Sequence, residues 1–207
     1  QTLLNETSGY WRCDTIGVSQ QARPILRLSN SEAGVNQETP GLYLIARQHS
    51  GETPGSWVLD GLLRRLAEVQ ARRLLVWAVP LSNIDGVEQG DYGKDNFPYD
   101  LNRAWGHPPM RHETLLIQRD VDRWGRLCKP TLAIDFHAPG ACEATGTYAY
   151  VPDPEKWHDA WKQLSGWTQA IEKGLGQQYA SGEFTRVGRY KSRWETPSFS
   201  ASWPRNS

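Results

Sequence analysis

Residues 41–54 read GLYLIARQHSGETP, a continuous apolar run that leads directly into a polar turn. The run Gly41–Ala46 is short and contains no polar position, which is typical of a strand buried on both faces of a parallel sheet. After Pro54, leucines recur at steps of three and four residues, and this spacing predicts an amphipathic helix over residues 55–70. The stretch therefore predicts a strand, a turn and a helix in succession.

The same order of elements continues along the chain. Apolar runs predict strands at residues 74–79, 131–136 and 148–151, helical spacing predicts helices at residues 113–128 and 155–179, and broken apolar patches predict edge strands and turns within residues 9–40. Residues 82–109 show little periodicity, and loops of that length in compact domains are usually functional. Alternating strands and helices predict an α/β fold whose mostly parallel sheet carries helices on both faces.

Length and composition limit the classes of function. The 207 residues suit a single domain, and the formal net charge is zero, so neither a nucleic-acid partner nor a membrane partner is expected. No apolar run approaches the roughly 18 residues needed to span a bilayer, and no leader sequence is visible. Three cysteines without CxxC spacing favour a reduced compartment, which predicts a cytoplasmic protein. The chain starts at Gln1 and ends at Ser207 in a polar stretch, as a fragment truncated at one or both ends would.

Two histidines and one glutamate follow two of the predicted strands. His49 and Glu52 are three residues apart in the turn after residue 46, and Gly51 between them allows a tight turn that points both side chains one way. His137 directly follows the strand 131–136, and the carboxyl ends of parallel strands meet at one edge of a sheet. Two imidazoles and one carboxylate are ligands of catalytic zinc sites, which keep a fourth position open. We therefore expect one zinc ion at His49, Glu52 and His137.

These residues also allow other interpretations. A single His-x-x-Glu is more often a surface turn than a metal site, but here it and Asp135-Phe-His137 each follow a predicted strand. Asp135 can either orient a ligand histidine or be a strand-end carboxylate, and the sequence leaves both open. The remaining histidines lie in polar or helical surroundings and are expected to be solvated side chains: His107, His112 and His158.

A carboxylate-binding pair is expected in the long loop. Asn102 and Arg103 are adjacent in the segment Asp100-Leu-Asn102-Arg103-Ala-Trp105. A guanidinium can donate two parallel hydrogen bonds to a carboxylate, and the neighbouring amide can add another. A solvated arginine in a turn is the alternative. A pocket for a free carboxylate close to a zinc site describes a carboxypeptidase.

The ordered motifs resemble the zinc metallocarboxypeptidase family, and most closely its cytosolic carboxypeptidase-like branch. They are Arg47-Gln-His49-Ser-Gly51-Glu52-Thr53, Asn83-Ile-Asp85-Gly86-Val87, Asp100-Leu-Asn102-Arg103-Ala-Trp105 and Asp135-Phe-His137. The resemblance implies an α/β fold with a mixed, mostly parallel sheet sandwiched between helices. It also implies one zinc ion (Zn2+) per chain on His49, Glu52 and His137, with Asn102 and Arg103 binding the substrate carboxylate.

Two positions depart from the family pattern. The family places an arginine shortly before an asparagine in the central loop, to stabilise the oxyanion, whereas this chain has Lys94. Lysine keeps the positive charge but loses the forked geometry, and a solvated loop lysine is the alternative. The family's general base is a glutamate after an apolar strand. Glu195 is the best late candidate, although the residues before it are basic, and a glutamate in a longer parent chain is the alternative.

These features together predict the chemistry. We expect a zinc-dependent metallocarboxypeptidase that hydrolyses the C-terminal peptide bond of peptides or proteins. One alternative is a zinc amidohydrolase of small N-acyl amino acids, which uses a similar ligand arrangement. Another is a non-catalytic zinc-binding or peptide-binding module. Residues 1–207 are expected to form one catalytic domain.

Overall fold

The computed structural model describes residues 2–94, 100–106, 108–138, 146–155 and 157–188. These residues fall into two units that meet in the chain at residues 138 and 139, and each unit is described by itself. The expectation of a single domain concerns the whole chain and stays a prediction. Among the described residues, no helix is long and apolar enough to cross a membrane.

A five-stranded mixed sheet lies at the centre of the N-terminal unit. Its strands are β1 (Arg12–Val18), β2 (Pro24–Ser29), β3 (Pro40–Ala46), β4 (Leu75–Val79) and β5 (Lys129–Phe136), in the spatial order β1-β2-β4-β3-β5. β3 runs parallel to both β4 and β5, whereas β2 pairs antiparallel with β1 and β4. The strands predicted from apolar runs at residues 41–46, 74–79 and 131–136 are confirmed as β3, β4 and β5, and the hairpin β1–β2 accounts for the broken apolar patches before residue 40.

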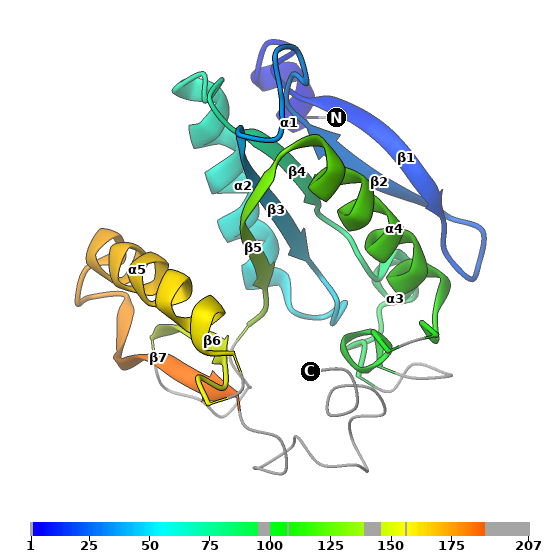
Figure 1. Cartoon of the computed structure of the whole chain (residues 1–207). Helices are drawn as coiled ribbons and strands as arrows, with labels where there is room; N and C mark the ends of the chain where they lie inside the picture. Colours follow the sequence, from blue (N-terminus) through cyan, green and yellow to red (C-terminus); the bar gives the residue numbers. More distant parts are fainter. Residues whose placement is uncertain (1, 95–99, 107, 139–145, 156, 189–207) are drawn as a thin grey trace. The chain divides into compact units, whose positions relative to one another are not determined.

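Two helices cover opposite faces of this sheet (Figure 1): α2 (Thr53–Glu68) and α4 (His112–Leu127). Alternate residues of β3 point to opposite faces. Leu44 therefore belongs to the same buried cluster as Leu63 of α2, whereas Tyr43 belongs to the cluster that contains Ile117 and Trp124 of α4. Because helices cover both faces of the sheet, β3 and β4 contain no charged side chain. The predicted α/β class, with a sheet between helices, is confirmed.

One buried charge interrupts the apolar packing under α4. The Arg27 side chain is almost completely inaccessible and donates hydrogen bonds to Asp120 at 2.9 Å and to Asp14 at 2.6 Å. Its guanidinium carbon lies 3.7 Å from the ring centre of Trp77, and the Tyr43 hydroxyl donates to the other oxygen of Asp120 at 2.9 Å. The two carboxylates pair both terminal nitrogens of Arg27, and Trp77 stacks on the guanidinium, while the buried Nε has no hydrogen-bond partner among the described residues. The burial of Asp120 was not predicted.

Short helices were missed by the sequence reasoning. α1 (Thr2–Glu6), α3 (Ile84–Gln89) and the 3-10 helix η1 (Leu101–Arg103) span six residues or fewer, too few for a helical period to appear. α3 and η1 lie within the stretch that was predicted as a long loop. The start of α3 is defined by Asn83, whose side-chain oxygen accepts a hydrogen bond from the Gly86 backbone at 3.2 Å.

The C-terminal unit contains β6 (Thr147–Pro152), α5 (His158–Leu175) and β7 (Ala180–Gly188). β6 and β7 pair in parallel as a separate two-stranded sheet, and α5 connects them in the chain. The predicted fourth strand and third helix are therefore confirmed. β7 was not predicted, because residues 180–188 contain no continuous apolar run.

Candidate metal centre

The sheet register brings the two predicted ligand segments together. β3 and β5 are parallel neighbours, and their last residues, Ala46 and Phe136, lie opposite each other. His137 follows Phe136 directly, while His49 lies three residues beyond Ala46 in the adjoining turn. Both side chains therefore emerge at the same carboxyl edge, as expected for ligand sites in parallel sheets.

The turn after β3 is held by local hydrogen bonds and by close packing. Arg47 adopts a left-handed φ of 63°, and its Nε donates to the Ser50 carbonyl at 2.7 Å. Gly51 was expected to supply conformational freedom, but its φ is not left-handed, and the reason for glycine is space. A Cβ there would lie 2.8 Å from the Tyr92 ring. The close approach of Tyr92, rather than backbone strain at Gly51, thus accounts for the glycine.

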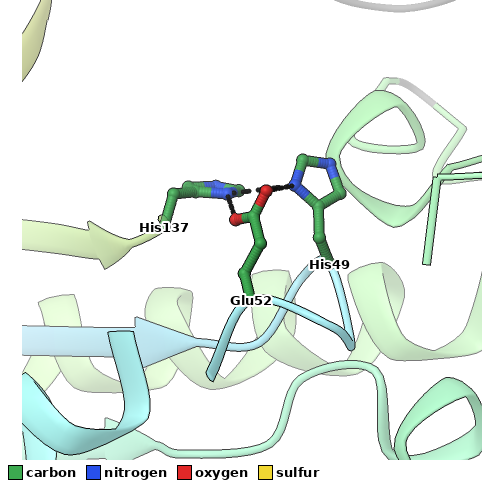
Figure 2. Close-up of side chains that lie close together, drawn as sticks. All are labelled: His49, Glu52 and His137. Carbon is green, nitrogen blue, oxygen red and sulfur yellow. Dashed lines mark hydrogen bonds and ion pairs between the residues drawn. The ribbon is translucent and has the colours of Figure 1, made fainter. Parts of the chain in front are cut away.

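Figure 2 shows the three predicted ligands pointing at one another. Glu52 Oε1 lies 2.8 Å from His49 Nδ1, Glu52 Oε2 lies 2.7 Å from His137 Nδ1, and the two Nδ1 atoms are 3.2 Å apart. One potential ligand atom from each residue lies within 4.8 Å of the others. His49 and Glu52 are buried, whereas the His137 side chain keeps 29% exposure, so the cluster is reached from the His137 side.

The three groups strongly perturb one another's pKa. Burial alone would raise the pKa of Glu52, but the hydrogen bonds and charges of the two histidines hold it far below its usual range. Burial likewise acts to lower the histidine pKa values, and it is outweighed by carboxylates. Asp135 and Glu52 raise the pKa of His137 to about 10, and Asp100 and Glu52 raise that of His49. The cluster therefore favours positive charge opposite Glu52.

Each imidazole is oriented by a second carboxylate on its other nitrogen. His137 Nε2 lies 2.7 Å from Asp135 Oδ2, and His49 Nε2 lies 3.2 Å from Asp100 Oδ1. Of the two interpretations of Asp135, the structure supports the one in which it orients a histidine. Metal-binding histidines usually have such a partner, which directs the opposite nitrogen to the metal. Asp100 was not singled out for this role, although it stands in the quoted loop motif.

The donor set fits a zinc ion. Two imidazole nitrogens and one carboxylate converge, all three within one small volume, and each ring has a carboxylate behind it. This is a ligand set of catalytic zinc proteins, in which a fourth position stays free for water or substrate. The residues that would hold the ion are His49, Glu52 and His137.

The predicted carboxylate-binding residues, Asn102 and Arg103, follow Asp100 closely in the sequence. Asp100, which contacts His49, also accepts a hydrogen bond from the Asn102 backbone at 2.9 Å and so caps η1. Asn102 is half-buried and Arg103 is buried at 7% exposure. Lys94 extends to the same cluster, with its Nζ 3.6 Å from Glu52 Oε1. Their roles toward a substrate stay predictions.

The structure describes two of the four remaining candidate residues. His112 and His158 are exposed at the first positions of α4 and α5, as predicted. His107 and the proposed base Glu195 lie outside the described residues.

The Asn83-Ile-Asp85-Gly86 motif supports the ligand turn. The Asn83 side chain donates to the Gln48 carbonyl at 3.3 Å, next to His49. Asp85 is buried and accepts hydrogen bonds from the Ser19 hydroxyl at 2.6 Å and from Arg23 at 2.8 Å. The motif thus holds the ligand turn against α3 and the β1–β2 connection.

The His49, Glu52 and His137 cluster and the mixed sheet between helices together indicate an α/β protein with a candidate metal site. Residues 1–125 match the family described as zinc carboxypeptidase, which is more than half of the chain. The chain therefore belongs to the zinc carboxypeptidase family, and the resemblance inferred from its motifs is confirmed.

Individual relatives agree with this assignment. Cytosolic carboxypeptidase 6 of Mus musculus is 31% identical over 124 residues, which cover 55% of this chain and 23% of the relative. A solved metallo-carboxypeptidase from Burkholderia cenocepacia has a TM-score of 0.66 at 22% identity, covering 92% of this chain and 52% of its own. An aspartoacylase family protein from Mesorhizobium loti has a TM-score of 0.58 at 16% identity, covering 75% and 49%. At such identities the two structures show the fold alone. The chain spans about a quarter of the mouse relative.

Proposed function

We propose that this chain forms the metal-binding part of a zinc carboxypeptidase that hydrolyses the C-terminal peptide bond of peptides or proteins. The observation that carries the proposal is the convergence of His49 Nδ1, His137 Nδ1 and the Glu52 carboxylate at the edge of β3 and β5. Family membership supports the same chemistry. A cytoplasmic location is also proposed, supported by the cytosolic relative.

One zinc ion would be held by His49, Glu52 and His137. When bound, such an ion supplies a Lewis acid that polarises a carbonyl and lowers the pKa of water. The protein's part is to present neutral imidazole nitrogens, and Asp100 and Asp135 do this by accepting the protons on the opposite ring nitrogens.

Substrate binding is assigned to Asn102 and Arg103. Asp100 contacts His49, and η1 begins at the next residue, so the pair lies two and three residues after a group that touches a proposed zinc ligand. A guanidinium can hold a terminal carboxylate by two parallel hydrogen bonds, which fixes both its position and its orientation. Recognition of that carboxylate would direct hydrolysis to the last peptide bond.

Two further groups complete the proposed site. Lys94 would stabilise the developing oxyanion as a point charge, and its position 3.6 Å from Glu52 Oε1 supports this role. Glu195 would take the proton from the attacking water and pass it to the leaving amine, a role supported by the sequence Trp194-Glu195-Thr-Pro197.

The test combines zinc content with product analysis. The chain is loaded with zinc and incubated with a peptide library, and release of single C-terminal amino acids is expected. His49→Ala should abolish both zinc retention and release, whereas His112→Ala, an exposed histidine of α4, should change neither. Activity that persists in His49→Ala would overturn the assignment.

The same assay separates the other classes of protein. The shared fold of the aspartoacylase family protein means that the fold cannot distinguish a peptidase from an amidohydrolase. Faster turnover of an acetylated amino acid than of a tripeptide would identify an amidohydrolase. Zinc binding without turnover of either substrate would identify a binding module.

A further inference from the structure

The Gln48 side chain is buried, at 3% exposure, and both ends of its amide are engaged. Its Oε1 accepts a hydrogen bond from the Trp105 indole Nε1 at 2.6 Å. Its Nε2 donates a short hydrogen bond to Asp135 Oδ2. That same Asp135 oxygen lies 2.7 Å from His137 Nε2. A continuous chain of hydrogen bonds therefore runs from Trp105 to a proposed zinc ligand.

The direction of this chain is determined at its Trp105 end. An indole N–H can only donate, so the amide oxygen of Gln48 must face Trp105 and the amide NH2 group must face Asp135. An ionised carboxylate can only accept, so Asp135 accepts from Gln48 and also from His137 Nε2. The proton of a neutral His137 therefore lies on Nε2. Its Nδ1 is left with a lone pair that points at Glu52 and His49.

We propose that Gln48 and Trp105 are positioning residues that set the tautomer of His137 for metal binding. The inference rests on the proposed zinc site and deepens it, because it assigns the proton on one ligand to two residues that do not touch the metal position. Reversal of the amide would present its oxygen to Asp135, and the two like partial charges would then repel.

The arrangement also explains how one loop serves both histidines. Asp100, just before η1, contacts His49 Nε2 directly, while Trp105, just after η1, acts on His137 through Gln48 and Asp135. Both imidazoles are therefore oriented from the segment that carries Asn102 and Arg103.

The experiment uses two variants and one matched control in the whole chain. Gln48→Met keeps the side-chain length and removes both hydrogen bonds, and Trp105→Phe removes the N–H while keeping an aromatic ring. Gln118→Met is the control, because Gln118 donates to the Trp105 backbone carbonyl at 2.9 Å and takes no part in the chain to His137. Zinc affinity is measured by competition with a chelator. The ring nitrogens are followed by NMR of the zinc-loaded protein with 15N-labelled histidine, of which there are five.

In the parent chain, His137 should show a protonated Nε2 and a zinc-bound Nδ1. Gln48→Met should weaken zinc binding about tenfold, the lower end of the effect for outer partners of metal ligands, and should shift or broaden the His137 ring signals. Trp105→Phe should act in the same direction but less, because the amide can then turn over. Gln118→Met should match the parent chain.

Two outcomes would overturn the inference, and they are distinguishable. Unchanged zinc affinity and unchanged ring signals in both folded variants would remove the role of Gln48 and Trp105 while leaving the zinc site intact. Failure of the parent chain itself to bind zinc would remove the zinc site and the inference together. Trp105→Phe decides the matter if Gln48→Met does not fold.

Discussion

Arg27 and Glu52 are both buried charges of the same unit, but their partners differ in kind. Both terminal nitrogens of Arg27 are paired with carboxylates, Asp120 and Asp14, which carry opposite charge at neutral pH. The stacking on Trp77 adds a further contact. The two terminal nitrogens of Arg27 need no additional partner, which is typical of a structural ion pair.

The partners of Glu52 are two imidazoles whose charge depends on bound protons. Their Nδ1 atoms are only 3.2 Å apart, and each ring has a carboxylate on its other side. The cluster is complete only when the rings take up protons or a cation replaces them. A divalent ion would release those protons as it binds. Arg27 is thus a buried charge whose partners are already part of the fold, whereas the partners of Glu52 leave room for a cation.

The largest effect is expected from removing His137, one of the three residues proposed to hold zinc. His137→Ala should lower zinc affinity by about a thousandfold, because roughly 10–16 kcal/mol of zinc binding is shared among few ligands in small sites. The free energy of unfolding of the metal-free chain should fall by less than the free energy of zinc binding does, because this side chain is 29% exposed and His49 still pairs with Glu52. Chelator competition and urea unfolding measure the two quantities, with His112→Ala as the control. A large loss of stability with zinc affinity intact would place His137 in the structural class.

The cluster of Arg27, Asp120 and Asp14 should respond in the opposite way. Asp120→Ala should lower the free energy of unfolding by about 3 kcal/mol, because it leaves Arg27 buried with one carboxylate instead of two. Zinc affinity per folded molecule should stay the same. Asp122→Ala, at an exposed position of the same helix, should have little effect on either quantity. A loss of zinc affinity in folded Asp120→Ala would show that the two clusters are coupled.

Lys94 adds a positive charge to the cluster of His49, Glu52 and His137. Lys94→Met should lower kcat for a peptide by about a hundredfold with little change in KM, as loss of one oxyanion-stabilising group does elsewhere. Lys94→Arg should retain most of the activity, since it keeps the charge. Lys129→Met, at the exposed start of β5, is the control. Full activity of Lys94→Met in a peptidase assay would make Lys94 a solvated loop lysine.

The smallest effect is expected at Asp85, a third buried carboxylate with a complete set of partners. Burial acts to raise the pKa of Asp85, but Ser19, Arg23 and the Gln21 backbone lower it. A lowered pKa in the folded state means that Asp85 contributes stability above the unfolded value, about 3.9, and that this contribution is lost as the pH falls.

The variant Asp85→Asn tests this linkage. It should lower the free energy of unfolding by about 1 kcal/mol at pH 7, and the difference from the parent chain should vanish as the pH falls well below 4. Urea unfolding followed by tryptophan fluorescence at several pH values measures both. Asp60→Asn, which removes a surface ion pair with Arg64, should show only a small difference at every pH. A difference for Asp85→Asn that is independent of pH would contradict the linkage.

Much of the N-terminal unit could be predicted because its elements are long or continuously apolar. The strand at residues 41–46 lacks polar positions since α2 and α4 cover both sheet faces, and the leucines of α2 repeat because only one helix face is buried. Short helices and β7 could not be predicted in this way. Six residues are too few to display a period, and residues 180–188 owe their strand conformation to pairing with β6.

The cluster of His49, Glu52 and His137 was predictable for a simpler reason. His49 and Glu52 are close in sequence, and His137 follows another strand of the predicted parallel sheet, so both segments were expected at the same edge. The structure adds that β3 and β5 are direct neighbours. The carboxylates behind the histidines were harder to find. Asp100 lies 51 residues beyond His49, and sequence spacing contains no information on which polar loop residue returns to which ring.

The sequence by itself thus indicated the α/β class, the family and the three residues that converge at the sheet edge, because these depend on local periodicity and on short ordered motifs. Only the tertiary structure decided which groups surround His49, Glu52 and His137. It placed Asp100 against His49, and it aligned Trp105, Gln48 and Asp135 behind His137. The physical reason is that the direction of a hydrogen bond depends on the position of both partners, and loops bring partners together over distances that no sequence pattern records.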